Sequence, residues 1–380
     1  MRRRSSLAVL CLLTAALVSC AGNTSDQASN EIVIGEFGSL TGTTATFGIS
    51  TKNGIDMAIE EVNKAGGLLG KQVRVIVEDD QGRPEEAQTV VTKLITSDQV
   101  VAILGEVASS RTLAAAPVAQ QSMIPMISPS STNPRVTEVG DYIFRVCFID
   151  PFQGFVMAKF ASSTLKVLNV AILRDIKNDY SVGLADVFAD NMKKMGGTIV
   201  SDESYSEGDT DFSAQLTSIR ARNPQAIFIP GYYTEVGLIA RQARRLGMTM
   251  PLLGGDGWDS PRLTDIGGEA LNDTYFSNHY SVDDPSPAIQ NFVSQYRTKY
   301  GETPDALAAL GFDSANILFD AIRRANSAES VKIRDAIAQT VDYPGVTGKI
   351  TLDANRNAVK PAVVLRVRDS KLEYVETITP

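Results

Sequence analysis

Short apolar runs rich in β-branched residues alternate with amphipathic stretches along almost the whole chain from residue 31 onward. The first run covers residues 32–37. The stretch after it repeats apolar side chains at the i, i+3, i+4, i+7 spacing of a buried helix face: Ile55, Ala58, Ile59 and Val62. Helices joining parallel strands produce this order, so the sequence predicts an α/β fold.

The alternation occurs twice, which indicates two sheets. It runs through about four units before residue 150, and it restarts near residue 170. Helical patterns follow from about residue 286 to 340, and antiparallel strands are expected between residues 348 and 377. We therefore predict two doubly wound, Rossmann-like lobes joined by a hinge with several crossings. Lobe 1 is expected to contain residues 31–150 and 280–350, and lobe 2 residues 151–279 and 351–380.

The N-terminus has the three parts of a secretory signal. Arginines at positions 2–4 precede an apolar stretch, residues 7–18, that is too short to span a membrane, and a small residue precedes Cys20. Residues 17–20 resemble a bacterial lipobox. We expect residues 1–19 to be removed, Cys20 to carry lipid, and residues 20–30 to form a flexible tether. A secreted protein with a chance cysteine is the alternative.

Charge and cysteine content exclude several classes of protein. The net charge is −8, and loss of the arginines in residues 1–19 would make it more negative, so nucleic-acid binding is not expected. Of the three cysteines, Cys11 would leave with the signal and Cys20 would be lipidated. Only Cys147 would then remain, and an internal disulfide is not expected.

The sequence contains none of the phosphate-loop, dinucleotide, nucleophile-elbow, zinc-protease or paired C-x-x-C motifs. The single histidine, His279, makes a histidine metal site improbable, and we expect no cofactor. Asp79 and Asp80 follow a strand and could bind a cation, although a solvated strand end is the simpler interpretation. A carboxylate pair for hydrolysis is not excluded by spacing alone.

Segments throughout the mature chain resemble the type I periplasmic binding proteins of the branched-chain amino acid family. They are residues 104–119 (LGEVASSRTLAAAPVA), 124–134 (IPMISPSSTNP), 38–42 (GSLTG), 58–67 (AIEEVNKAGG), 231–235 (GYYTE), 241–244 (RQAR) and 254–258 (GGDGW). Their order and spacing together are specific. The resemblance implies a receptor that binds an amino acid between two closing lobes and delivers it to the membrane permease subunits of an ATP-driven importer.

The resemblance also implies how a ligand carboxylate is held. A serine at a helix N-terminus and a loop with backbone and threonine donors bind it in the family, and Ser109, Ser130 and Thr132 occupy these positions here. Free N–H groups and the positive end of the helix dipole suit an anion. Alternatively, Ser109 is only a helix cap and Thr132 only a turn residue.

In the family, a carboxylate from the second lobe holds the ligand ammonium, and Asp256 occupies this position, where members often carry glutamate. Tyr180 and Tyr232 match aromatic positions that flank the ammonium or the side chain, with Tyr233 as a competitor, and Phe47 matches an aromatic lid. Phe152 and Trp258 could be cleft wall or core. The early disulfide of the family is missing, because Gln81 or a neighbour and Ala108 stand at its positions.

We therefore expect an exported, membrane-anchored, monomeric receptor for an amino acid, branched-chain or otherwise small and aliphatic. The same fold could instead bind urea, short amides or aromatic acids, or could serve a separate sensor. An extracellular hydrolase is the remaining alternative. The wall of the side-chain pocket comes from many loops, so the sequence leaves the identity of the amino acid open.

Overall fold

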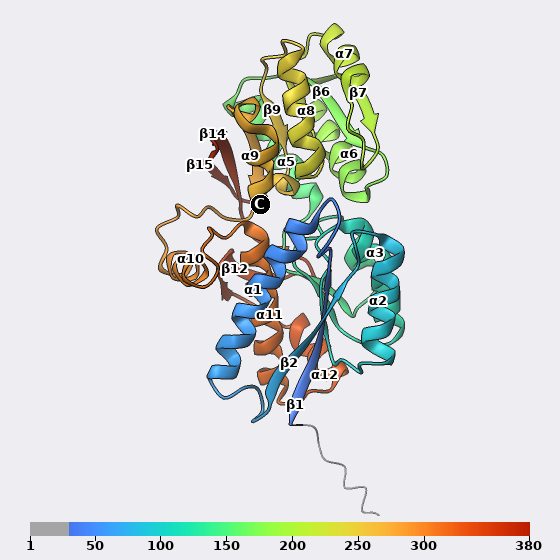
Figure 1. Cartoon of the computed structure of the whole chain (residues 1–380), viewed down its shortest axis with the longest axis vertical. Helices are drawn as coiled ribbons and strands as arrows, with labels where there is room; N and C mark the ends of the chain where they lie inside the picture. The colour runs from blue at the N-terminus through green and yellow to red at the C-terminus, as the bar shows by residue number, and fades with distance from the viewer. Residues whose placement is uncertain (1–29) are drawn as a thin grey trace, which may run out of the picture. The chain divides into compact units, whose positions relative to one another are not determined.

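The computed structural model describes residues 30–380 of the chain, which form an α/β structure with two main sheets (Figure 1). The predicted signal segment, Cys20 and all but the last tether residue lie outside the described residues. No helix within residues 30–380 is long and apolar enough to span a membrane.

The first sheet has five parallel strands in the order β2-β1-β3-β4-β5. They are β1 (Glu31–Gly38), β2 (Gln72–Asp79), β3 (Ile103–Leu104), β4 (Met126–Ser128) and β5 (Ile143–Arg145). Alternate side chains of β1 pack on opposite faces: Ile32 and Ile34 join the core formed with α1 and α11, whereas Val33 and Phe37 contact the core under α2 and α3. Both faces are therefore covered, as predicted for a doubly wound sheet.

Figure 1 shows this arrangement, with α1 and α11 on one side of the sheet and α2 and α3 on the other. We call the part built on this sheet lobe 1. Its helices are α1 (Ala45–Lys64), α2 (Pro84–Thr96), α3 (Ser109–Gln121), the short α4 (Arg135–Glu138), α10 (Pro287–Tyr300), α11 (Ala306–Ala325) and α12 (Ser330–Ala338).

The second sheet has seven strands in the order β15-β14-β10-β9-β8-β6-β7 and forms lobe 2. Its strands are β6 (Asn169–Asp175), β7 (Thr198–Tyr205), β8 (Ala226–Phe228), β9 (Leu252–Gly254), β10 (Thr274–Asn278), β14 (Ala362–Arg368) and β15 (Lys371–Ile378). β14 and β15 are antiparallel, as predicted for the end of the chain. The helices are α5 (Asp150–Lys159), η1 (Phe160–Thr164), α6 (Asp179–Lys194), α7 (Ser213–Ala221), α8 (Tyr233–Arg245), η2 (Asp256–Trp258), α9 (Pro261–Gly267) and η3 (Gly268–Leu271).

The chain passes between the two sheets three times, after β5, after β10 and before β14. The third crossing was expected at residue 350, but that position lies inside β12 (Gly348–Leu352), which pairs with β11 (Tyr343–Gly345) and β13 (Ala358–Val359) in a small separate sheet. Ile350 and Ala358 belong to the same core as α1 and α11. Lobe 1 therefore extends to β13, and the crossing lies between Val359 and Ala362.

Helices α1 and α11 pack unusually closely because glycine occupies the contact points. A Cβ atom on Gly54 would lie 1.9 Å from the carbonyl oxygen of Ala308, and one on Gly311 would lie 2.4 Å from that of Thr51. Real atoms do not approach this closely, so neither position can accept a side chain without separating the helices. The contact holds the two parts of lobe 1, which are far apart in the sequence, against each other.

Candidate functional site

A small cavity lies between the two lobes, where strands of both sheets end. Its wall contains six of the seven residues predicted to bind ligand; the complete lining is Phe47, Val107, Ser109, Ser130, Tyr180, Tyr232, Asp256, Gly257 and Leu307. Most of these residues follow directly on strands β3, β4, β8 and β9 or begin the next helix. This is the edge at which open α/β sheets present loops and helix N-termini to small molecules.

The lobe 1 side of the cavity offers hydroxyl and N–H groups. Ser109 is the first residue of α3, and the cap position belongs to Ala108. Its Oγ accepts a hydrogen bond from the backbone N–H of Asn133 at 3.2 Å. A hydroxyl at a helix N-terminus is suited to a carboxylate.

Thr132 is the predicted residue that does not line the cavity. Its side chain is buried, and its carbonyl oxygen accepts a hydrogen bond from the backbone N–H of Asp150 at 2.9 Å. Asp150 begins α5 and is also buried, and desolvation raises the pKa of its carboxyl to about 8. Asp150 does not line the cavity either.

Asp256 supplies the negative charge of the cavity. Its Oδ1 accepts a hydrogen bond from Gln153 Nε2 at 2.7 Å, and its Oδ2 lies 3.0 Å from His279 Nε2 and 3.4 Å from Ser130 Oγ. The carboxylate is therefore held from α5, from the segment after β10 and from lobe 1. Its orientation is fixed from three directions, and it still faces the cavity.

His279 does not neutralise Asp256. Its ring is fully buried and stacks on Phe148, with centroids 3.9 Å apart and planes 21° from parallel. Burial lowers the pKa of the imidazole, despite the opposing effect of Asp256, which favours the uncharged ring. Asp256 is the one carboxyl group among the residues that line the cavity, and a carboxylate there suits an ammonium group.

Three aromatic rings close the cavity. Tyr180 and Tyr232 stack with centroids 5.4 Å apart, and Phe47 meets Tyr232 edge to face at 5.3 Å. Tyr180 Oη accepts a hydrogen bond from the backbone N–H of Gly257 at 3.2 Å, next to Asp256. Ring faces beside a carboxylate are favourable neighbours for a cation.

The other aromatic candidates lie outside the cavity wall. Tyr233 packs edge to face on Phe47, and its Oη accepts a hydrogen bond from the backbone N–H of Thr46 at 3.4 Å. Trp258 is fully buried and donates from Nε1 to the carbonyl oxygen of Ile229 at 2.9 Å, and it therefore belongs to the core. Phe152 packs against Phe148 at 6.1 Å.

Asp79 and Asp80 have structural roles beside the loop that follows β1. Asp79 Oδ1 accepts hydrogen bonds from the backbone N–H groups of Leu40 and Gln81 at 3.0 and 2.8 Å. Asp80 is buried and bonded to Ser39 Oγ at 3.1 Å, so a solvated strand end is the wrong description for this residue. Within residues 30–380, no group of three or more histidine, cysteine or acidic side chains could hold a metal ion.

The sequence did not predict Val107, Gly257 and Leu307 of the cavity wall, nor the two residues that contact Asp256 from outside it, Gln153 and His279. Both belong to crossing segments, and their positions beside Asp256 depend on where the chain passes between the sheets. The Asp150-Pro151 pair, with proline in the first turn, was the available signal for α5 and would have placed Gln153 in its first turn. We find no comparable sequence signal for His279.

Two doubly wound lobes enclosing a small, negatively charged, aromatic-lined cavity define a solute-binding protein. The periplasmic binding protein family matches residues 31–371, and the chain belongs to this family. It is 31% identical over 341 residues to the Leu/Ile/Val-binding protein BraC3 of Rhizobium johnstonii, covering 89% of this chain and 92% of that protein.

Solved structures agree in fold. The leucine-binding protein LivK of Thermotoga maritima superposes with a TM-score of 0.89 at 41% identity, covering 92% of this chain and 99% of that one. The substrate-binding protein LivJ of Streptococcus pneumoniae, solved in complex with isoleucine, gives a TM-score of 0.88 at 36% identity, with 92% and 100% covered. The type I periplasmic binding fold predicted from the sequence is therefore confirmed, and the family comprises binding proteins rather than enzymes.

Proposed function

We propose that this protein captures an amino acid, branched-chain or otherwise small and aliphatic, between its lobes and delivers it to the membrane subunits of an ABC importer. The observation that carries the proposal is that Asp256 and Ser109 line the same cavity. The two residues lie on different lobes, one suited to an ammonium and the other to a carboxylate. An α-amino acid carries these two charges at one end of the molecule, whereas benzoate-like acids carry no cation.

The remaining roles follow from the surroundings of these two groups. Ser130 and the backbone around Thr132 add donors on the carboxylate side, and Tyr180 and Tyr232 flank the ammonium. Phe47, Val107 and Leu307 leave only apolar surface for the ligand side chain. The relatives named for leucine, isoleucine and valine support the same choice of ligand.

A thermal-shift screen tests this assignment. Protein beginning at residue 21 would be unfolded and refolded to remove carried-over ligand, then heated with L-leucine, L-isoleucine, L-valine, L-alanine, urea, acetamide and benzoate. We expect branched-chain amino acids to raise the melting temperature, because ligand at about 100 times its Kd stabilises the folded state by about 2.7 kcal/mol. A response to acetamide or benzoate, with none to any amino acid, would instead assign the cavity to amides or aromatic acids.

We further propose that the protein is exported and anchored through a lipid on Cys20. The charged start, the apolar stretch and the lipobox-like residues support this location. Full-length protein is expected in the membrane fraction of its host, and Cys20→Ser is expected to release it into the soluble fraction. Cys147→Ser is the matched control and should stay with the membranes. Equal membrane association of all three proteins would contradict the anchor.

A further inference from the structure

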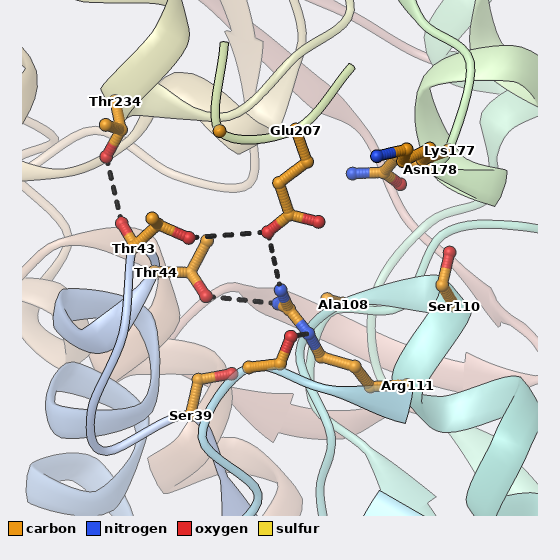
Figure 2. A network of polar contacts seen from close by, with 12 residues as sticks. Ser39, Thr43, Thr44, Ala108, Ser110, Arg111, Lys177, Asn178, Glu207 and Thr234 are labelled. Carbon is orange, nitrogen blue, oxygen red and sulfur yellow. Dashed lines mark hydrogen bonds and ion pairs between the residues drawn. The ribbon is translucent and has the colours of Figure 1, made fainter. Parts of the chain in front are cut away.

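A polar network joins the two lobes outside the ligand cavity (Figure 2). At its centre, Arg111 Nη2 of α3 in lobe 1 lies 3.0 Å from Glu207 Oε1, which belongs to the loop between β7 and α7 in lobe 2. Neither residue lines the ligand cavity; both line an adjoining pocket that shares Tyr232 with it.

Arg111 is also held by contacts within lobe 1. Its Nε donates to the carbonyl oxygen of Gly82 at 2.7 Å and its Nη1 to Thr44 Oγ1 at 3.1 Å, and its side chain is only 3% exposed. Burial disfavours its charge, but Glu106 and the acids around it outweigh burial and raise the pKa of the guanidinium. The two hydrogen bonds within lobe 1 therefore orient the guanidinium that faces Glu207.

Glu207 is positioned by lobe 2 and contacts the segment that leads into α1. Its backbone N–H donates to Asp175 Oδ1 at 3.1 Å, and its Oε1 accepts a hydrogen bond from Thr43 Oγ1 at 3.3 Å. Thr234 of lobe 2 donates to the carbonyl oxygen of Thr43 at 2.9 Å. Figure 2 shows these contacts around Thr43 and Thr44, directly before the helix that carries Phe47.

We propose that Arg111 and Glu207 form a closure latch that sets how long the ligand stays bound. A contact between residues on different lobes stabilises the closed state and not the separated lobes, and it does so whether or not ligand is present. Its loss makes opening easier and substitutes no residue of the cavity wall. It also frees the start of α1, which carries Phe47 of that wall. The predicted effect on how long the ligand stays bound rests on the proposed amino-acid capture. The predicted effect on closure of the lobes does not.

The chain provides a matched control. Arg135 Nη1 of lobe 1 lies 3.0 Å from Asp179 Oδ1 of lobe 2, and these side chains are 66% and 39% exposed. Such an exposed ion pair contributes little, because water and salt screen it and both side chains lose freedom. Glu207→Gln removes a carboxylate from the pair with Arg111, which is buried. Asp179→Asn removes a carboxylate from the exposed pair with Arg135.

The first measurement is the dissociation rate of L-leucine by stopped-flow fluorescence of Trp258, the single tryptophan, which lies two residues after Asp256. Glu207→Gln is expected to raise this rate about tenfold, with the association rate changed less than about twofold. Asp179→Asn should leave both rates unchanged. Equal dissociation rates for Glu207→Gln and the parent would overturn the latch. An effect confined to L-glutamate would also overturn it, since Arg111 would then belong to a ligand subsite together with Lys177, which lines the same adjoining pocket.

The second measurement needs no ligand. Nitroxide labels at the exposed positions Gln88 of lobe 1 and Lys194 of lobe 2 report the distance between the lobes. The buried thiol of Cys147 does not compete for label, because desolvation raises its pKa to about 12. Without ligand, Glu207→Gln should populate longer distances than the parent, and Asp179→Asn should not. If L-leucine fails to bind the parent, the proposed ligand is wrong, but the ligand-free distance measurement still tests the latch. Identical distance distributions for Glu207→Gln and the parent would overturn it.

Discussion

Asparagine in place of Asp256 is expected to weaken amino-acid binding by about 100-fold or more. Asp256 is the one charged side chain in the wall of the described cavity. Removing it leaves a buried ammonium without a counter-charge, a change that typically costs about 2–5 kcal/mol. Asparagine has nearly the same size, and Gln153 can rotate its amide to keep one hydrogen bond, so the fold should survive. Isothermal titration with the best ligand of the screen measures the loss.

Asp265→Asn is the control for this experiment. Asp265 is an acid of the same lobe, its side chain is 63% exposed, and it does not line the cavity. The control should bind like the parent, and melting temperatures without ligand should show that both variants are folded. Binding of Asp256→Asn within about threefold of the parent would contradict the ammonium site and return attention to amide ligands.

Valine in place of Gly54 is expected to destabilise the protein by about 3 kcal/mol or more. Its Cβ would start 1.9 Å from the carbonyl oxygen of Ala308, which is backbone of the neighbouring helix and cannot rotate away. The two helices would have to separate, exposing the core that they share with β1. Urea unfolding followed by circular dichroism measures the change in the free energy of unfolding.

Glu61→Val is the matched control, since it adds the same β-branched side chain at an exposed position of the same helix. We expect this variant to unfold within about 0.5 kcal/mol of the parent. If the two variants were equally stable, the close crossing of α1 and α11 would not be a determinant of stability.

Local sequence patterns predicted the elements and the edge of the sheets at which the cavity lies. Ser109, Tyr232 and Asp256 each follow a strand, and parallel strands all end at one edge, so residues with wide sequence separation meet there. The periodicity of the strands was sufficient to predict this edge. The resemblance to a family then assigned roles to particular side chains at it.

Long-range pairing was not predictable in the same way. The run around Ile350 has a strand pattern, but a pattern does not say which sheet a strand joins, and this strand pairs with β11 and β13 in lobe 1. His279 and Gln153 come close to Asp256 because two crossings meet there. The paired charges of Arg111 and Glu207, which are 96 residues apart, carry no local signal either.

The interleaved order of the lobes has a consequence for synthesis. Ile32 and Ile34 of β1 share their core with Leu318 of α11 and Ile350 of β12, so the first strand made is buried by some of the last residues made. A nascent chain that ends before α11 leaves this face of the sheet covered by α1 alone. The core of lobe 1 is therefore completed only when translation is almost finished.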